Sequence, residues 1–337
     1  MSIRVSALVS VYNAERFMRA ALEDLVAQTL FAHGELEIIV INSGSPQGEE
    51  TIVKEFQNRH ANIKYVRTER ETIYAAWNRG LRLASGTYLT NANTDDRHRP
   101  DGLELLANAL ERSGSGVAYA DALITRGENE TLGTNAADRV FRWPRFSLRQ
   151  LLMHSVFGPQ PMWRRSLHDE IGLFDPKYTV AGDYEFFIRA AWRQGAVHVP
   201  EILGLYFEGG TESRNLEKCK NETEEVLRRY RWSIPIEDIY PRCRELDNPQ
   251  AARAVALLDF ARCLATGPHP DAALTRRLRD EAALILLRST PRAWASLSLR
   301  WLAARRKNAA AVRDTGRWHP VLADLPPIAS EIVKPLS

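Results

Sequence analysis

The amino-acid sequence predicts an open α/β sheet followed by a separate helical segment. Strand-like apolar runs alternate with helix-length segments over roughly the first 125 residues, which is the pattern of parallel strands joined by helices. Residues 36–41 (LEIIVI) are almost continuously apolar, as in a strand buried on both faces of a sheet. Beyond about residue 235 the strand signals stop, and Ala, Leu and Arg dominate. A length of 337 residues suits one large domain and a smaller one.

The first elements follow from local pattern. Residues 3–11 (IRVSALVSV) are rich in β-branched side chains and predict a strand. Asn13 is expected to cap a helix over 13–29, in which Phe17, Ala21 and Leu25 share one buried face. The strand at 36–41 ends in the turn-rich NSGSPQG, and the helix-like segment EETIVKEFQNRH follows.

The remaining elements continue the alternation. Residues 63–68 (IKYVRT) predict a third strand, 73–85 a helix and 88–93 (YLTNAN) a fourth strand. After a helix at 101–114, residues 116–125 predict a fifth strand. Strands connected in this way imply right-handed crossovers.

Composition narrows the cellular setting. The chain is 45% hydrophobic and 26% charged, with a net charge of only +3, and it has no apolar run of the roughly 20 residues needed to span a bilayer. The N-terminus enters a strand directly, and the three cysteines lack metal-site spacing. These features predict a cytoplasmic protein, with peripheral attachment to the inner face of the membrane as the alternative. No nucleic-acid recognition motif is present.

The helical segment is expected to form a second domain over 233–337, after a first domain over 1–232. Residues 276–317 hold eleven Lys or Arg against three Asp or Glu, and Trp294, Leu297 and Trp301 share one helical face. Such a helix suits an anionic membrane surface, where lipid-linked acceptors would be found. The other interpretation, which is the default, is that the tryptophans pack against the first domain or against a second copy in a homodimer.

Small polar side chains cluster where three of the predicted strands end. Ligands of open parallel sheets gather at this edge. Adjacent carboxylates there favour Mg²⁺ or Mn²⁺, whose remaining positions usually go to water and phosphate, and this suggests a nucleoside diphosphate. Neither a P-loop nor a G-x-G-x-x-G motif is present, so a cation would have to neutralise the phosphates. The alternative for Asp95 and Asp96 is capping of the following helix.

Four stretches carry a family resemblance: VSALVSVYNAERFMRAALEDLVAQT, LEIIVINSGSPQG, IYAAWNRGLRLASGTYLTNANTDDRHRPDGLE and FDPKYTVAGDYEFFIRAAWRQG. In this order they resemble the inverting glycosyltransferases of family 2, over roughly residues 3–230. The resemblance implies a GT-A fold, which is a Rossmann-like, mixed and mostly parallel sheet flanked by helices, here with a C-terminal helical appendage. The variants TIYAAWNRG and FGPQPMWRRSLHDEIGLFD are most similar to the bacterial branch that builds surface polysaccharides.

The resemblance also implies a donor site. Asp95 would be the main ligand of Mn²⁺ or Mg²⁺, and Asp96 would support the loop or the ribose. The family's Asp-x-Asp-Asp begins with Asn93 here, which leaves one charge fewer, and its Asp-Asp-Gly-Ser becomes NSGS. An Asn can both donate and accept, so a uracil base is not implied. The donor-binding residues expected are Ser10, Tyr12, Asn42, Ser43, Asn78, Asn93, Asp95 and Asp96.

Asp183, in AGDYEFFIRAAWRQG, would be the general base by the same resemblance. Inversion needs a carboxylate that removes the proton of the attacking hydroxyl. Many relatives carry Glu-Asp, whereas Gly182 precedes Asp183 here, so only one candidate base remains. The alternative is that Asp183 caps the helix and that Glu185 complements the helix dipole.

Substrate contacts are expected from two further stretches. HSVFGPQPMWRRSLH combines groups that stack on sugars with groups that bind anions, and YFEGGTESRN has a glycine pair that can hinge a loop. The alternatives are a core position for the tryptophan, solvated arginines and an ordinary surface turn. The candidates are Gln160, Trp163, Arg164 and Glu208.

The sequence thus predicts a metal-dependent inverting glycosyltransferase that moves a sugar from a nucleoside diphosphate donor to a glycan or lipid-linked glycan. Two other functions stay open. A catalytically silent nucleotide- or glycan-binding scaffold of the same fold would explain Asn93 and Asn42. A nucleotidyltransferase would also use nucleotides and Mg²⁺, although the Gly-rich, basic loop expected after its first strand is missing.

Overall fold

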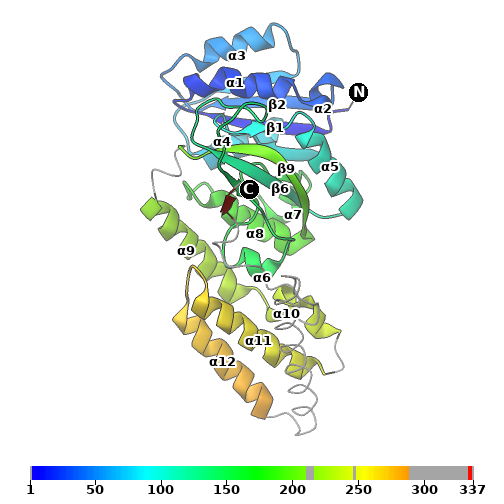
Figure 1. Cartoon of the computed structure of the whole chain (residues 1–337), viewed down its shortest axis with the longest axis vertical. Helices are drawn as coiled ribbons and strands as arrows, with labels where there is room; N and C mark the ends of the chain where they lie inside the picture. The colour runs from blue at the N-terminus through cyan, green and yellow to red at the C-terminus, as the bar shows by residue number, and fades with distance from the viewer. Residues whose placement is uncertain (1, 210–215, 246–247, 288–332, 336–337) are drawn as a thin grey trace. The chain divides into compact units, whose positions relative to one another are not determined.

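The computed structural model describes residues 2–209, 216–245, 248–287 and 333–335 (Figure 1). The chain divides into two compact units. The first comprises Met1–Phe146, Ser155–Val226 and Ser330–Ser337, and the second comprises Ser147–His154 and Leu227–Ala329. The domain boundary expected at 232/233 stays a prediction. No local pattern indicated that Ser147–His154 would join the second unit.

Among the described residues, ten strands of the first unit form one mixed sheet. The pairings β1–β2, β1–β4, β2–β3 and β6–β9 are parallel, and the shorter pairings are antiparallel. The strands are β1 (Val5–Val11), β2 (Leu36–Asn42), β3 (Ile63–Arg67), β4 (Tyr88–Asn91), β5 (Arg97–His98), β6 (Val117–Thr125), β7 (Arg139–Phe141), β8 (Met162–Arg164), β9 (Ala196–Phe207) and β10 (Val333–Pro335). All five predicted strands are confirmed.

Helices lie on both faces of this sheet. Val5, Ala7, Val9 and Val11 of β1 face a core shared with α1, α3 and α5. Each fully buried valine stabilises the fold by about 1.5–3 kcal/mol. The opposite face receives α4, whose Gly80 lies against Leu8. The helices of this unit are α1 (Glu15–Val26), α2 (Thr29–Ala32), α3 (Glu49–Gln57), α4 (Ile73–Leu83), α5 (Gly102–Ser113), α7 (Leu167–Ile171), α8 (Gly182–Gln194) and the first part of α9 (Leu216–Ser233).

The start of α1 differs from the prediction. Asn13 is not its cap: the residue has a positive φ of 52°, which asparagine tolerates better than most residues, and the helix begins at Glu15. Side chains of the segment between β2 and α3 hold this end of the helix instead. Ala14 N donates to Glu49 Oε1 (2.8 Å), and Glu15 N donates to Gln47 Oε1 (3.1 Å).

The second unit is helical in its described part, with α6 (Leu148–Leu151), the end of α9, α10 (Ile236–Ile239), the 3₁₀ turn η2 (Pro241–Arg244), α11 (Pro249–Thr266) and α12 (Ala272–Leu287). The buried Arg149 pairs with Asp259 of α11 (2.8 Å), which ties the short α6 segment to this unit. None of the described helices is long and apolar enough to cross a membrane. The predicted helical face of Trp294, Leu297 and Trp301 lies outside the described residues.

Candidate active site

Three loops meet at the carboxyl edge of the sheet, because β1 lies between β4 and β2. Val11 pairs with Asn42, and Leu8 pairs with Asn91, so the strands end side by side. The loops that follow them, at 10–13, 42–45 and 92–96, hold seven of the eight expected donor-binding residues. The topology therefore brings these segments to one edge, as the sequence led us to expect.

Asp95 lies in the loop after β4 with its carboxylate partly buried. No other side chain in the described part of the chain forms a hydrogen bond or an ion pair with that carboxylate; its own backbone N–H is a donor to it. Burial raises the pKa of Asp95, while the charges of Arg97 and Arg16 act in the opposite direction. Asp95 thus has coordination capacity that the protein itself does not use.

Asp96 has a different role from its neighbour. Its Oδ1 accepts the Phe207 N–H (3.2 Å), and its Oδ2 accepts the side-chain amide of Asn93 (3.1 Å). The side chain is almost fully buried, and these bonds tie the loop to the end of β9. Neither acid caps the following helix, since α5 begins only at Gly102. Asp96 and Asn93 support the loop that carries Asp95.

A divalent ion could bind at Asp95 only if a bound substrate supplied further ligands to the ion. No group of three or more His, Cys, Asp or Glu side chains within the described ranges could enclose a metal. Mg²⁺ is commonly held by one or two carboxylates, with substrate phosphates and water filling its remaining positions. One available carboxylate at the edge of the sheet matches that arrangement.

The loop after β2 gives Asn42 an internal role. Its Oδ1 accepts the Ser45 N–H (2.8 Å), and the side chain is fully buried. Its Nδ2 has no partner among the described residues, so the role of Asn42 in donor binding stays a prediction. Gly44 makes the turn with a φ of 68°, and an added Cβ would lie 3.1 Å from Arg70 N. Among the described residues, the Ser43 hydroxyl and Nδ2 of Asn42 are both buried without a hydrogen-bond partner, so two polar groups of this loop are left unsatisfied.

The loop after β1 presents an aromatic ring to solvent. Tyr12 is 40% exposed, and the Arg70 guanidinium lies 3.5 Å from the centre of its ring. Ser10, at the end of the strand, is partly exposed. A cation stacked on an exposed ring can contact both a flat ligand and an anionic one.

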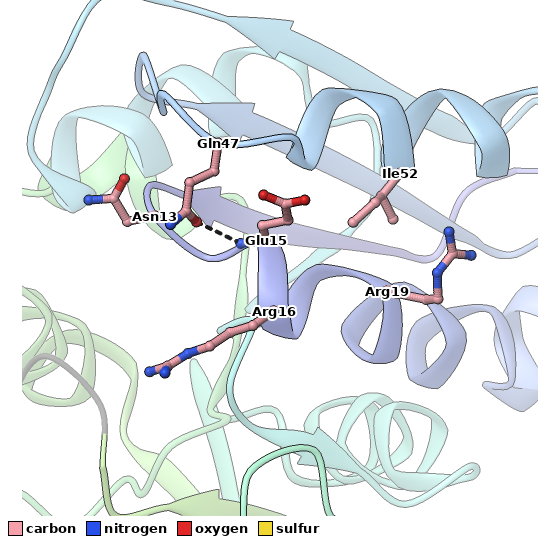
Figure 2. Close-up of a pocket in the computed structure, with 6 residues that line it drawn as sticks. All are labelled: Asn13, Glu15, Arg16, Arg19, Gln47 and Ile52. Atoms are coloured by element: carbon pink, nitrogen blue, oxygen red, sulfur yellow. Dashed lines mark hydrogen bonds between the residues drawn. The ribbon is translucent and has the colours of Figure 1, made fainter.

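A hollow of about 690 Å³ opens beside these loops, between the start of α1 and the segment that leads into α3 (Figure 2). Pockets for small ligands commonly have this size. Arg16, whose charge opposes the effect of burial on the pKa of Asp95, lies on its wall. None of its lining residues was predicted to bind a ligand; they are Asn13, Glu15, Arg16, Arg19, Gln47 and Ile52.

Asp183 lies in the first turn of α8, and one oxygen of its carboxylate accepts hydrogen bonds from neighbouring residues. The Tyr74 hydroxyl (3.0 Å) and the Tyr184 N–H (2.8 Å) both donate to Oδ1. Burial raises the pKa of Asp183, and these donors only partly offset it. Glu222 acts in the same direction as burial through its charge. A carboxylate with a raised pKa is better suited to taking up a proton than an ordinary aspartate.

One face of α4 holds the segment that leads to Asp183. The Asn78 amide donates to Phe174 O (2.8 Å) and accepts from Phe174 N (3.0 Å). Both of its polar atoms are used and the side chain is buried, so the expected donor contact of Asn78 is not found. The Trp77 and Tyr74 rings pack on the ring of Phe174. The spacing of Tyr74, Trp77 and Asn78 puts all three on the same side of the helix.

The turn before α8 is held by a carboxylate from α9. Glu222 Oε2 accepts the backbone N–H groups of Thr179 (3.0 Å), Val180 (2.9 Å) and Ala181 (3.0 Å), and Oε1 accepts the Thr179 hydroxyl (2.9 Å). Burial acts to raise the pKa of Glu222, but these donors outweigh burial and hold it below the usual range.

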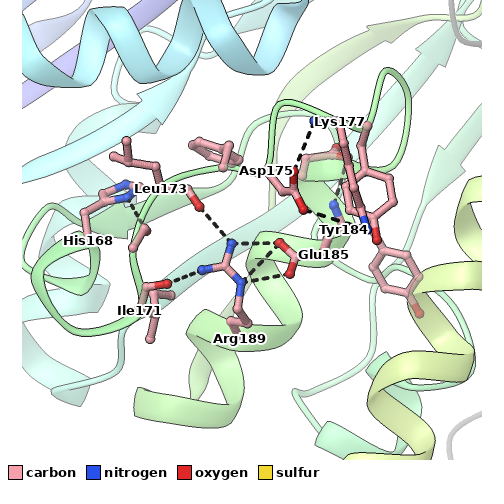
Figure 3. A network of polar contacts seen from close by, with 12 residues as sticks. His168, Ile171, Leu173, Asp175, Lys177, Tyr184, Glu185 and Arg189 are labelled. Atoms are coloured by element: carbon pink, nitrogen blue, oxygen red, sulfur yellow. Dashed lines mark hydrogen bonds and ion pairs between the residues drawn. The ribbon is translucent and has the colours of Figure 1, made fainter.

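A second network fixes the other end of the segment. Figure 3 shows the Arg189 guanidinium between the Glu185 carboxylate (2.7 Å) and the carbonyls of Ile171 and Leu173. His168 lies nearby, and burial lowers its pKa to about 4, so the ring is neutral at ordinary pH. Glu185 therefore serves this network, whereas the sequence had suggested a partner for the helix dipole.

Three of the four predicted substrate residues serve the fold. Trp163 is fully buried and donates to His168 Nε2 (2.9 Å), so it cannot stack on a sugar. Arg164 donates to the carbonyls of Leu110 and Ser115, near the edge opposite the site, because β8 runs antiparallel to β4. Gln160 is almost fully buried and donates to a backbone carbonyl (2.7 Å).

Glu208, the fourth, pairs with the guanidinium groups of Arg126 (3.0 Å) and Arg139. These arginines hold the pKa of Glu208 below its usual range even though burial opposes them. The remainder of the predicted hinge loop, residues 210–215, lies outside the described residues. Glu208 is partly exposed and remains the predicted substrate contact that a ligand can reach.

Comparison with known proteins gives a family and a fold. The model of a family described as glycosyl transferase family 2 matches residues 6–172. "Glycosyltransferase GlyA" of Streptococcus pneumoniae is 35% identical over 118 residues, which are 35% of this chain and 16% of that protein. "Uncharacterized glycosyltransferase YwdF" of Bacillus subtilis is 28% identical over 208 residues, 60% of this chain and 74% of that protein. The chain thus spans a small part of the first relative.

Among solved structures, S. aureus TarS 1–349 in complex with UDP-GlcNAc superposes with a TM-score of 0.54 and 18% identity, covering 84% of this chain and 90% of that one. At this identity the likeness concerns the fold. The predicted fold class, a mixed α/β sheet of the GT-A type, is confirmed.

Proposed function

Residues 6–172 of the chain belong to glycosyl transferase family 2, and from this premise we propose that the protein transfers a sugar, with inversion, from a nucleoside diphosphate to a hydroxyl of a glycan. The acceptor is a glycan or a lipid-linked glycan of the bacterial surface, used on the cytoplasmic side of the membrane. The observation that carries the proposal is the Asp183 carboxylate, held through Oδ1 in the first turn of α8.

The donor diphosphate would bind at the carboxyl edge of the sheet. Asp95 is available there for Mn²⁺ or Mg²⁺, and a bound ion would offset the charge that develops on the leaving diphosphate. The Tyr12–Arg70 pair and the Ser43 hydroxyl would contact the nucleoside; the stacking of Arg70 on Tyr12 and the unsatisfied Ser43 hydroxyl support this. A fold neighbour, TarS, has been solved with UDP-GlcNAc, which supports a nucleotide sugar as the donor.

Asp183 would act on the acceptor. Its Oδ2 takes the proton of the acceptor hydroxyl while that oxygen forms a bond to the anomeric carbon. The bond from this carbon to the phosphate oxygen breaks, and its electron pair leaves with the diphosphate. One base and one displacement invert the anomeric centre. General base catalysis of this kind contributes about 10²–10⁴-fold to the rate.

The test is Asp183→Asn, because asparagine keeps an oxygen for the Tyr74 and Tyr184 donors but cannot take a proton. We expect transfer to fall by about 10²–10⁴-fold, with donor binding by calorimetry unchanged. Asp169→Asn, an exposed substitution in α7, serves as the matched control and should keep full activity. Near-normal transfer by Asp183→Asn would contradict the assignment of the base.

A further inference from the structure

The Tyr74 side chain is buried in the candidate active site, and neighbouring rings restrict its orientation. It lies in the first turn of α4, which begins at the Thr72 cap, and it is 2% exposed. The Trp77 ring meets it edge-on at 5.4 Å, and the Phe174 ring stacks beside it at 6.1 Å. These contacts leave the ring little freedom, so its hydroxyl is directed at one place.

That place is the carboxylate of Asp183, 109 residues away in sequence. The Tyr74 hydroxyl donates to Oδ1, which also accepts the Tyr184 N–H. In the described part of the chain no side chain donates to Oδ2. Both donors from other residues thus bind Oδ1, and no other described residue donates to Oδ2.

Gly182 makes this contact possible. A Cβ built at Gly182 would lie 2.7 Å from Cδ2 and Cε2 of Tyr74, closer than two carbon atoms can approach. Any larger residue at this position would displace the ring and withdraw its hydroxyl from Asp183. The glycine that precedes the base in this sequence is explained by the tyrosine that occupies its side-chain space.

We propose that Tyr74 is a positioning residue of the transfer reaction: its hydroxyl fixes Oδ1 of Asp183 and leaves Oδ2 to receive the acceptor's proton. The proposal rests on Asp183 being the base. A donor to the ionised carboxylate also favours the charged form, so Tyr74 lowers the pKa of Asp183 against the effect of burial. The negative charge of Glu222, on α9, acts in the opposite direction and raises the pKa of Asp183.

The experiment compares Tyr74→Phe with Tyr178→Phe. Phenylalanine keeps the ring and its packing and removes only the hydroxyl. Tyr178 is a matched control, because it is equally buried, lies in the segment that leads to Asp183 and donates to a different carboxylate, that of Glu225 (3.3 Å). Transfer rates are measured across pH, together with KM for the donor and the melting temperature.

For Tyr74→Phe we expect kcat at neutral pH to fall by about 10-fold, as for the loss of a hydrogen bond to a charged group. KM for the donor should hold, and the acidic limb of kcat/KM should move to higher pH, because the carboxylate has lost a donor to its charged form. Gly182→Ala should move the limb in the same direction, and the two changes combined should add little. Tyr178→Phe should leave the limb in place.

The inference is overturned if Tyr74→Phe leaves both rate and limb unchanged, or if it lowers the rate equally at every pH, which is the result of looser packing alone. Failure of the proposed function looks different: Asp183→Asn itself would then remain active. An inactive Asp183→Asn beside an unaffected Tyr74→Phe removes only the role of Tyr74.

Discussion

At the scale of single residues, the proposed metal ligand Asp95 and the proposed base Asp183 have different surroundings. Asp95 is left without a side-chain partner in the described structure, as suits a ligand shared with a substrate, whereas Asp183 is held by two donors on one oxygen. Burial raises the pKa of both. A carboxylate that folding desolvates costs stability wherever it is charged, and functional sites commonly carry that cost.

This cost gives a prediction on stability. The pKa of Asp183 is higher in the folded than in the unfolded chain, so its contribution to stability is present below the ordinary aspartate value of about 3.9 and is lost as pH rises through the folded pKa. Asp183→Asn removes the charge and keeps the oxygen acceptor. We therefore expect this variant to melt at a higher temperature than the parent at pH 8, with the gap closing towards pH 4. Thermal melts across pH measure it, and a gap that is independent of pH would contradict it.

At the scale of elements, the site depends on how helices hold the segment before α8. One face of α4 binds it through Phe174, Arg189 fixes its start, and Glu222 of α9 gathers the N–H groups at its end. Pre-organisation of this kind keeps the base in place without help from the substrate.

Glu222→Gln tests this holding of the turn. An amide has one oxygen, and its NH₂ group must face donors that now lack an acceptor, so we expect a loss of about 1–3 kcal/mol in unfolding free energy. Transfer should also slow as Asp183 loses its position. Glu225→Gln is the control, since that exposed side chain pairs with Lys177 on the surface and should cost under about 1 kcal/mol. Urea unfolding gives both values, and equal small effects would contradict the role of Glu222.

The elements also show how far the sequence could lead. The five strands with long apolar runs were predictable, and so was the edge where their loops meet. The strand β8 was not, because three residues inside an aromatic stretch carry no period. The strand β9 was hidden by Pro200 and by its irregular pairing with β6. A short antiparallel strand such as β8 is defined by its neighbours in the sheet rather than by local pattern.

The site was predictable in part for the same reason. A polar residue that follows a strand is placed by the fold, so Asp95 and Asp96 could be brought to the edge from sequence. Whether a Trp or an Arg faces a ligand or the interior depends on contacts from distant segments, as with Trp163. The Tyr74–Asp183 contact had no local signal, since it joins two helices far apart in the chain.

At the scale of the whole molecule, the residues with proposed chemical roles all belong to the first unit. Asp95 lies in a loop after a central strand, and Asp183 lies on a helix whose partner Tyr74 follows the strand β3. The segments that follow β3 and β4 at the carboxyl edge of the sheet thus carry Asp95 and the tyrosine that contacts Asp183. The account requires that one bound nucleotide sugar reach Asp95 with its phosphates and Asp183 with its sugar.

A crystal structure with a nucleoside diphosphate and Mn²⁺, measured at the manganese absorption edge, tests this requirement most directly. The account predicts an anomalous peak between the Asp95 carboxylate and the two phosphates, with the β-phosphate on the side of Asp183. A bound nucleotide whose manganese lies elsewhere, with Asp95 touching neither metal nor phosphate, would contradict it.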